Sequence, residues 1–182
     1  MKKRFSERYE ADADAIFRFC VIRVSDREQA LDITQETFTR YWKSLAGGEE
    51  ISNERAFLFT VAYRLIVDWY RKKRAEPMSS MDDDNTGEAF DPIDERTAES
   101  MGMGAEGRFL VDAISKLAPS NRDAVYLRFV EGLSPPEIGK ALGISSGAAS
   151  VRVSRGLVEL RKITGYDDID GEDTGTDSKS MD

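Results

Sequence analysis

The chain has 182 residues, 40% hydrophobic and 33% charged, a composition typical of soluble globular proteins. It holds no histidine and a single cysteine, which exclude His-dependent catalysis, His/Cys zinc sites and an internal disulfide framework. The net charge is −8, but it is unevenly distributed along the chain: residues 75–106 and 164–182 are strongly acidic, whereas 52–74 and 107–163 are net basic. The net charge therefore does not exclude nucleic-acid binding by the basic segments.

Hydrophobic spacing predicts three helices in the first 74 residues. The first, at roughly 6–24, buries Ile16, Phe19, Cys20 and Val21. The second begins after Asp26, a candidate N-cap, and ends near Leu45; its predicted apolar stripe is Leu31, Thr34, Phe38, Tyr41, Trp42 and Leu45. The third begins after Ser52 or Asn53 and ends in a basic run at 71–74.

The most apolar early stretch, residues 16–24, is interrupted by Arg18 and Arg23. It can serve neither as the core of a signal peptide nor as a membrane span. We therefore expect no membrane insertion and a cytoplasmic location. Cys20 lies on an apolar stripe, so we expect it in the core rather than in a redox sensor.

The second predicted helix carries a polar face opposite its apolar stripe. Four of its residues recur at spacings of three and four and form the candidate face: Asp32, Gln35, Glu36 and Thr39. Such a face on a single helix is most often only solvated. The string DITQETF, residues 32–38, nevertheless marks it as a candidate partner surface.

The third predicted helix interleaves aromatic and basic residues. Core packing accounts for Trp69, but Phe59, Tyr63 and Tyr70 fall near the polar side. Exposed rings stack on unpaired bases at about 1–3 kcal/mol each, and basic side chains bind phosphates. A basic helix end can also complement the helix dipole, but four consecutive cations exceed that need. The candidate residues for melted DNA are Phe57, Phe59, Tyr63, Arg64, Tyr70, Arg71, Lys72, Lys73 and Arg74.

Two segments are too polar to pack. Residues 75–106 form a predicted flexible acidic linker, and residues 165–182 a predicted disordered acidic tail. The fold class we expect is all-α, with two small helical domains at 1–74 and 107–164.

The second domain contains a predicted helix-turn-helix. Ser134 and Glu137 form a capping box around two prolines, Gly143 suits the left-handed residue that ends the helix, and Ser145 or Ser146 starts the next. Such a motif inserts its second helix in the DNA major groove. The candidate base-reading residues on that helix are Ser146, Ser150, Val151, Arg152, Ser154 and Arg155.

Taken in order, DITQETF, FLFTVAYRLIVDWYRKKR, LAPSNRDAVYLRFVEGLSPPEIGKALGIS and the helix that follows resemble the extracytoplasmic-function (ECF) RNA polymerase sigma factors. The resemblance spans about 5–74 and 107–162. It implies that the first domain is sigma region 2, whose Asp32, Gln35 and Glu36, with Thr39 on the same face, bind the clamp helices of the largest subunit of core polymerase. Region 2 would also capture the minus-ten strand. The second domain would be region 4, which binds the minus-thirty-five promoter element.

The same resemblance implies RNA polymerase core and promoter DNA as partners, with an anti-sigma factor as a further candidate, and neither a cofactor nor a metal. Three features depart from the family pattern. Arg64 stands where asparagine is usual, the 46–53 loop carries Glu49 and Glu50 where a cation is common, and Ser150 and Ser154 replace larger or basic residues.

Two other function classes stay open. One is a stand-alone helix-turn-helix DNA-binding regulator, which would leave DITQETF and the aromatic-basic helix unexplained. The other is a sigma-like antagonist that occupies polymerase without initiating. We do not expect an enzyme, because the sequence offers neither a nucleophile–base pair nor a metal-ligand set.

Overall fold

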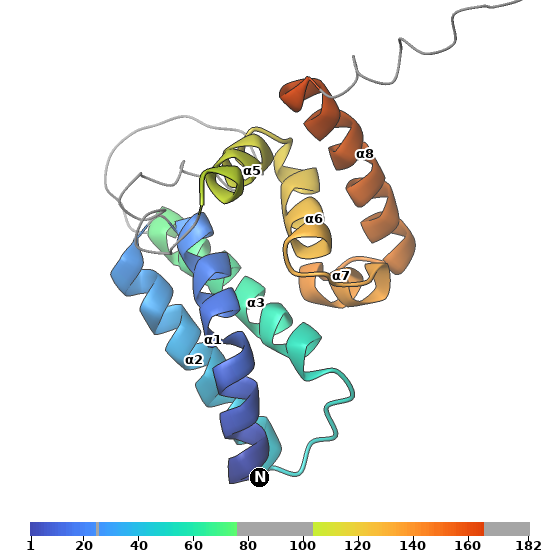
Figure 1. The fold of residues 1–182 in the computed structure, drawn as a ribbon. Helices are drawn as coiled ribbons and strands as arrows, with labels where there is room; N and C mark the ends of the chain where they lie inside the picture. The colour runs from blue at the N-terminus through green and yellow to red at the C-terminus, as the bar shows by residue number, and fades with distance from the viewer. Residues whose placement is uncertain (25, 76–103, 166–182) are drawn as a thin grey trace, which may run out of the picture.

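The computed structural model describes residues 1–24, 26–75 and 104–165, and every regular element in these ranges is an α-helix (Figure 1). In chain order the helices are α1 (Lys2–Val24), α2 (Arg27–Ala46), α3 (Glu54–Ala75), α5 (Ala105–Ser115), α6 (Pro119–Phe129), α7 (Pro135–Leu142) and α8 (Ser146–Thr164). The all-α prediction is confirmed. Most of the predicted linker and tail, residues 76–103 and 166–182, lies outside the described residues.

Helices α1, α2 and α3 form the first bundle, and local capping sets where two of them begin. The Asp26 carboxylate accepts a hydrogen bond from the Gln29 N–H at 3.1 Å, as predicted for α2. Asn53, rather than Ser52, caps α3, because its Oδ1 accepts from the Ala56 N–H at 2.8 Å. Helix α1 begins at Lys2, before the predicted start at residue 6.

One residue of the predicted stripe, Leu31, lies outside the buried face of α2, and three residues that were not in the stripe lie within that face. Leu31 is 39% exposed, whereas the residues that face the core are Ala30, Ile33, Thr34, Thr37, Phe38 and Tyr41. These residues follow spacings of three and four from Ala30, so Leu31 lies one position outside the face that α1 and α3 cover. Leu31 therefore lies beside Asp32 at the protein surface.

Helices α5–α8 form the second bundle, and the predicted helix-turn-helix lies within it. The Ser134–Glu137 capping box starts α7, and hydrogen bonds from Ser134 hold the pKa of Glu137 below its ordinary value. Gly143 ends α7 at φ +69°, and Ser145 caps α8 by accepting from the Ala148 N–H at 3.1 Å. These features confirm the predicted turn.

Two glycines set how closely backbones approach in the second bundle. A side-chain carbon at Gly156 of α8 would lie 2.4 Å from Cγ2 of Val125 and 3.1 Å from Cβ of Asn121, both on α6. At Gly139 of α7 it would lie 2.8 Å from the carbonyl oxygen of Ile144. Only glycine allows α6, α7 and α8 to pack at this distance, and this packing orients α8.

We expect Gly156→Ala to lower the free energy of unfolding by about 1–2 kcal/mol, because the added methyl overpacks a site closed by fully buried Val125. The control is Gly147→Ala, also on α8, where nothing lies within 4 Å of the new methyl. Alanine there should be neutral or stabilising, since it is the better helix former. Urea unfolding of both variants measures this, and equal midpoints would contradict the packing argument.

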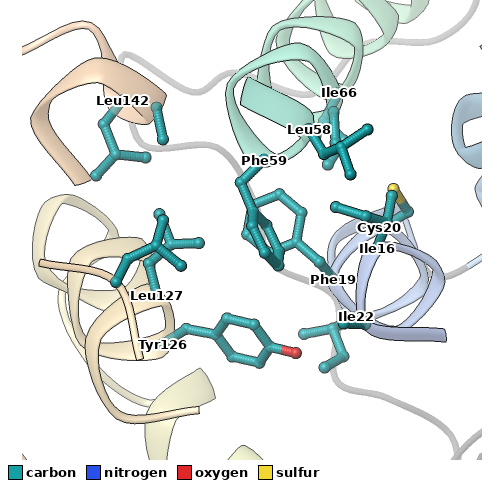
Figure 2. Close-up of a cluster of buried hydrophobic side chains, with 14 of the residues drawn as sticks. Ile16, Phe19, Cys20, Ile22, Leu58, Phe59, Ile66, Tyr126, Leu127 and Leu142 are labelled. Atoms are coloured by element: carbon teal, nitrogen blue, oxygen red, sulfur yellow. The ribbon is translucent and has the colours of Figure 1, made fainter. Parts of the chain in front are cut away.

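The two bundles share one hydrophobic core (Figure 2). The rings of Phe19 on α1 and Phe59 on α3 meet edge to face, with centroids 5.2 Å apart. Tyr126 on α6 lies 5.8 Å from Phe19, and Figure 2 shows Leu127 and Leu142 on the same side as Tyr126, facing Phe59. Helices α3 and α7 also contact each other. The sequence did not predict this contact between the bundles.

Candidate nucleic-acid and partner interfaces

The polar face of α2 is exposed. Asp32, Gln35 and Thr39 are exposed, and Glu36 is half-exposed. Thus none of the four residues predicted to bind a partner is buried in the contact between the bundles. A rigid helix that displays two carboxylates and an amide at helical spacing suits a partner with a basic helical surface.

Two neighbours modify this α2 face. The Arg40 guanidinium donates to the Glu36 carboxylate at 2.8 Å, an exposed pair one helical turn apart. Exposed pairs of this kind contribute little to stability, so a partner cation can replace Arg40 at small cost. Leu31 adds an exposed apolar side chain beside Asp32. The α2 face therefore offers both charge and apolar contact area.

Phe59 corrects the sequence prediction. It was predicted to stack on melted DNA, but its side chain is 0% exposed and packs against Phe19. In this conformation it belongs to the core that joins the bundles and cannot reach a base. The prediction failed because the side of α3 that looks polar in isolation is covered by α1 and the second bundle.

The other aromatic candidates on α3 are half-buried. The Phe57 ring centroid lies 6.1 Å from that of Tyr41, and the Tyr70 hydroxyl donates to the backbone carbonyl of Arg23. Tyr63 is also half-buried against the core. These three rings keep partial access to solvent.

The predicted cations of α3 lie on its surface. Arg64, Arg71, Lys72 and Lys73 are exposed, whereas the side chain of Arg74 lies outside what the structure describes. Arg71 pairs with Asp68 at 2.9 Å, and the Lys73 ammonium lies 5.0 Å from the centroid of the Trp69 ring. Both contacts lie within α3, so neither ties the basic end of this helix to another element.

A cleft of about 440 Å³ lies between the first bundle and the helix-turn-helix. Its walls are the loop that carries Glu49 and Glu50, the face of α3 that carries Phe57 and Arg64, and two residues of α7, Glu137 and Lys140. Asn53 of the loop donates a hydrogen bond to Glu137. The α3 surface predicted to hold melted DNA is thus partly covered by α7.

The predicted recognition residues lie on the outer side of α8. Ser146, Ser150, Ser154 and Arg155 are exposed, Val151 is 48% exposed, and Arg152 is half-buried. The Ser150 hydroxyl donates to the carbonyl of Ser146 at 3.1 Å. Because Ala149 and Gly156 face the rest of the bundle, the other side of α8 is available to a major groove.

Sequence reasoning missed a set of charged residues at the contact between the bundles: Asp12, Arg23 and Glu131, which are buried, and Arg55 and Asp123, which are partly buried. Arg23 on α1 donates to the Asp123 carboxylate on α6 at 2.6 and 2.9 Å. The only hint of such a contact in the local sequence is an arginine or aspartate at an otherwise apolar helix position.

The described residues hold no cluster of His, Cys, Asp and Glu side chains suited to a metal ion. None of the described helices has the length and apolarity needed to cross a bilayer.

Two family models match the chain, and together they cover both bundles. Residues 8–76 match the model for sigma-70 region 2, and residues 110–160 match that for sigma-70 region 4. The RNA polymerase sigma factor CarQ of Myxococcus xanthus is 32% identical over 162 residues, which cover 88% of this chain and 89% of CarQ.

Two further proteins are similar to the chain. The ECF sigma factor SigE of Mycolicibacterium smegmatis is 32% identical over 82% of this chain, which spans only 57% of SigE. Among solved structures, the sigma factor RpoE of Bartonella quintana, in complex with the anti-sigma factor NepR, superposes with a TM-score of 0.65 at 21% identity, over 91% of this chain and 99% of RpoE.

Proposed function

Because the chain belongs to the ECF RNA polymerase sigma factors, we propose that it directs core RNA polymerase to specific promoters and helps to open them. The observation that supports this most directly is that the surface proposed to bind polymerase and the surface proposed to bind duplex DNA are both exposed. The α2 face with Asp32 and Gln35 is open on one bundle, and the outer side of α8 is open on the other.

In this proposal the two bundles divide the contacts with polymerase and promoter DNA. The α2 face binds the clamp helices of the largest polymerase subunit, and α3 with its cations holds the non-template strand of the minus-ten element. Helix α8 enters the major groove at the minus-thirty-five element. The free energy for opening the promoter then comes from binding. Base stacking that is lost when the duplex opens is replaced by contacts between the unpaired bases and the aromatic rings of α3. The chain needs no cofactor or enzymatic activity of its own, and it acts in the cytoplasm.

Binding at the upstream element depends on few cations. Arg152 and Arg155 are the only charged residues among the six recognition candidates, and Ser150 and Ser154 add none. Salt dependence scales with the number of phosphates that a protein neutralises. We therefore expect the affinity of the second bundle for duplex DNA to change less with salt than that of a more basic recognition helix.

The function can be tested by transcription from a random DNA library with core polymerase of the same cells. Sequencing transcript 5′ ends should reveal two conserved elements at constant spacing, which appear only when the chain is added. Binding to core without any transcript would instead favour an antagonist. Tight duplex binding without any binding to core would favour a stand-alone regulator.

The family resemblance also suggests an anti-sigma factor as a partner. This stays a prediction, since none of the described residues identifies such a protein. A purified candidate that binds the chain should block transcription in the library assay, and lack of inhibition would reject it.

A further inference from the structure

Helix α8 carries an exposed stripe that extends beyond the predicted base-reading residues. Val151, Arg155, Val158 and Lys162 follow one another at spacings of four, three and four, so they share one face of the helix. The two valines are 48% and 47% exposed, and both cations are exposed. These four residues, which we call the α8 stripe, lie on the outside of the second bundle (Figure 1).

Duplex DNA alone does not account for the α8 stripe. A recognition helix contacts bases mainly through its N-terminal residues, whereas Val158 lies about three turns after the start of α8. Phosphates accept hydrogen bonds from cations, and an exposed valine gains nothing from them. Valines that alternate with cations instead suit an acidic peptide segment that also carries an apolar side chain.

The chain itself contains such a segment directly after α8. Residues 166–182, which we call the acidic tail, hold seven acidic residues and one lysine, a net charge of −6. Five of the acids fall within 167–173, where Ile169 stands between Asp168 and Asp170. The acidic tail therefore offers the charge opposite to that of the cations in the α8 stripe, together with an apolar side chain for its valines.

The acidic tail begins beside the α8 stripe and is long enough to cover it. Lys162 lies three residues before Gly165, where a left-handed backbone at φ +74° ends the helix. Seventeen residues reach about 55 Å when extended, whereas the stripe is about 16 Å long. A short tether gives an effective concentration in the millimolar range, so contacts too weak to hold a free peptide suffice here.

We propose that the acidic tail binds the α8 stripe and competes with duplex DNA for the recognition helix. The contact itself requires neither DNA nor polymerase. The competition rests on the proposed function, because Val151 and Arg155 belong both to the stripe and to the predicted base-reading residues. Such competition lowers the affinity of α8 for every duplex by the same factor, which leaves weak nonspecific sites empty while promoters are still bound.

Paramagnetic broadening of amide signals in the free chain tests the contact. A spin label on Thr176→Cys should broaden the amide signals of residues 150–155. Cys20 stays unlabelled because burial raises the pKa of its thiol to about 12. Replacing the five acids of 167–173 by the corresponding amides should lower this broadening at least about threefold, because the tail then loses its attraction to the stripe.

Two adjacent exposed cations provide the matched control for the site of contact. Lys162→Glu puts a repelling charge into the α8 stripe and should lower the broadening as far as the amide substitutions do. Arg161→Glu makes the same charge change about 100° around the helix, outside the stripe, and should keep most of the broadening. Circular dichroism checks that both variants stay helical. Unchanged broadening in Lys162→Glu, or an equal loss in both variants, would overturn the proposal.

Affinity for a duplex of unrelated sequence tests the competition. The chain with the five amide substitutions should bind at least about fivefold more tightly than the wild type at low salt, because more of α8 is accessible. The control makes the same change in net charge between the bundles, at Asp82, Asp83, Asp84, Glu88 and Asp91.

The two measurements fail in different ways. Equal gains in affinity from the tail and control substitutions would mean general charge repulsion and would overturn the competition, as would broadening without any gain. If the tail binds the α8 stripe but no variant binds a promoter duplex through α8, the proposed function fails instead.

Discussion

Asp32→Lys is expected to weaken binding of the chain to core RNA polymerase by at least about tenfold while leaving its fold unchanged. Asp32 is exposed on α2 and shares a face with Gln35 and Glu36. Removing one member of a charged pair at an interface costs about 2–5 kcal/mol, and 1.4 kcal/mol is a factor of ten. Lysine would also repel the cations that meet this face. Fluorescence anisotropy of the labelled chain titrated with core measures the affinity.

The control for this variant is Glu10→Lys, which makes the same charge change at an exposed site on α1, outside the α2 face. It should bind core within about twofold of the wild type, because distant exposed charges are screened. Thermal unfolding of both variants should match the wild type. If Glu10→Lys weakens binding as much as Asp32→Lys, the α2 face is not the polymerase contact.

The second large effect is expected at Arg155, the exposed arginine on the outer side of α8. Loss of an arginine that reads a base costs about 1–3 kcal/mol and relaxes specificity at that position. Arg155→Ala should therefore reduce transcription from a promoter with an intact upstream element about tenfold or more. It should also lose discrimination at one base pair there. Transcript yields from promoters substituted base by base would show both effects.

Arg161→Ala is the matched control, since Arg161 is exposed in the last turn of the same helix. It should change yields no more than about threefold and equally for all promoter sequences. Uniform loss in Arg155→Ala, without any change in base preference, would mean that Arg155 contacts only phosphate.

Local chemistry explains why the sequence could predict the helix ends and the turn. Asp26, Ser134, Gly143 and Ser145 act on backbone groups within four residues of themselves, so their roles can be read from the chain. The polar face of α2 is likewise local, because it depends only on helical spacing. Its assignment to polymerase came from the family resemblance and not from spacing.

Features that depend on distant packing could not be predicted. Phe59 looked exposed because helical spacing alone does not say which second element covers α3. Leu31 was assigned to the core although the buried position is its neighbour, Ala30. Which of the two faces the core depends on how α1 and α3 pack against α2. Arg23 and Asp123 are 100 residues apart, and nothing near either residue identifies its partner. The contact between bundles therefore needed the structure.

The division of labour between the bundles is tested most directly by site-specific photocrosslinking within one complex of core, chain and promoter. A photoreactive residue at Ser150 of α8 should crosslink to duplex DNA near minus-thirty-five. One at Tyr63 of α3 should crosslink to the non-template strand near minus-ten. Crosslinks from both positions to the same DNA segment, or none from Tyr63 when the promoter is open, would contradict the account.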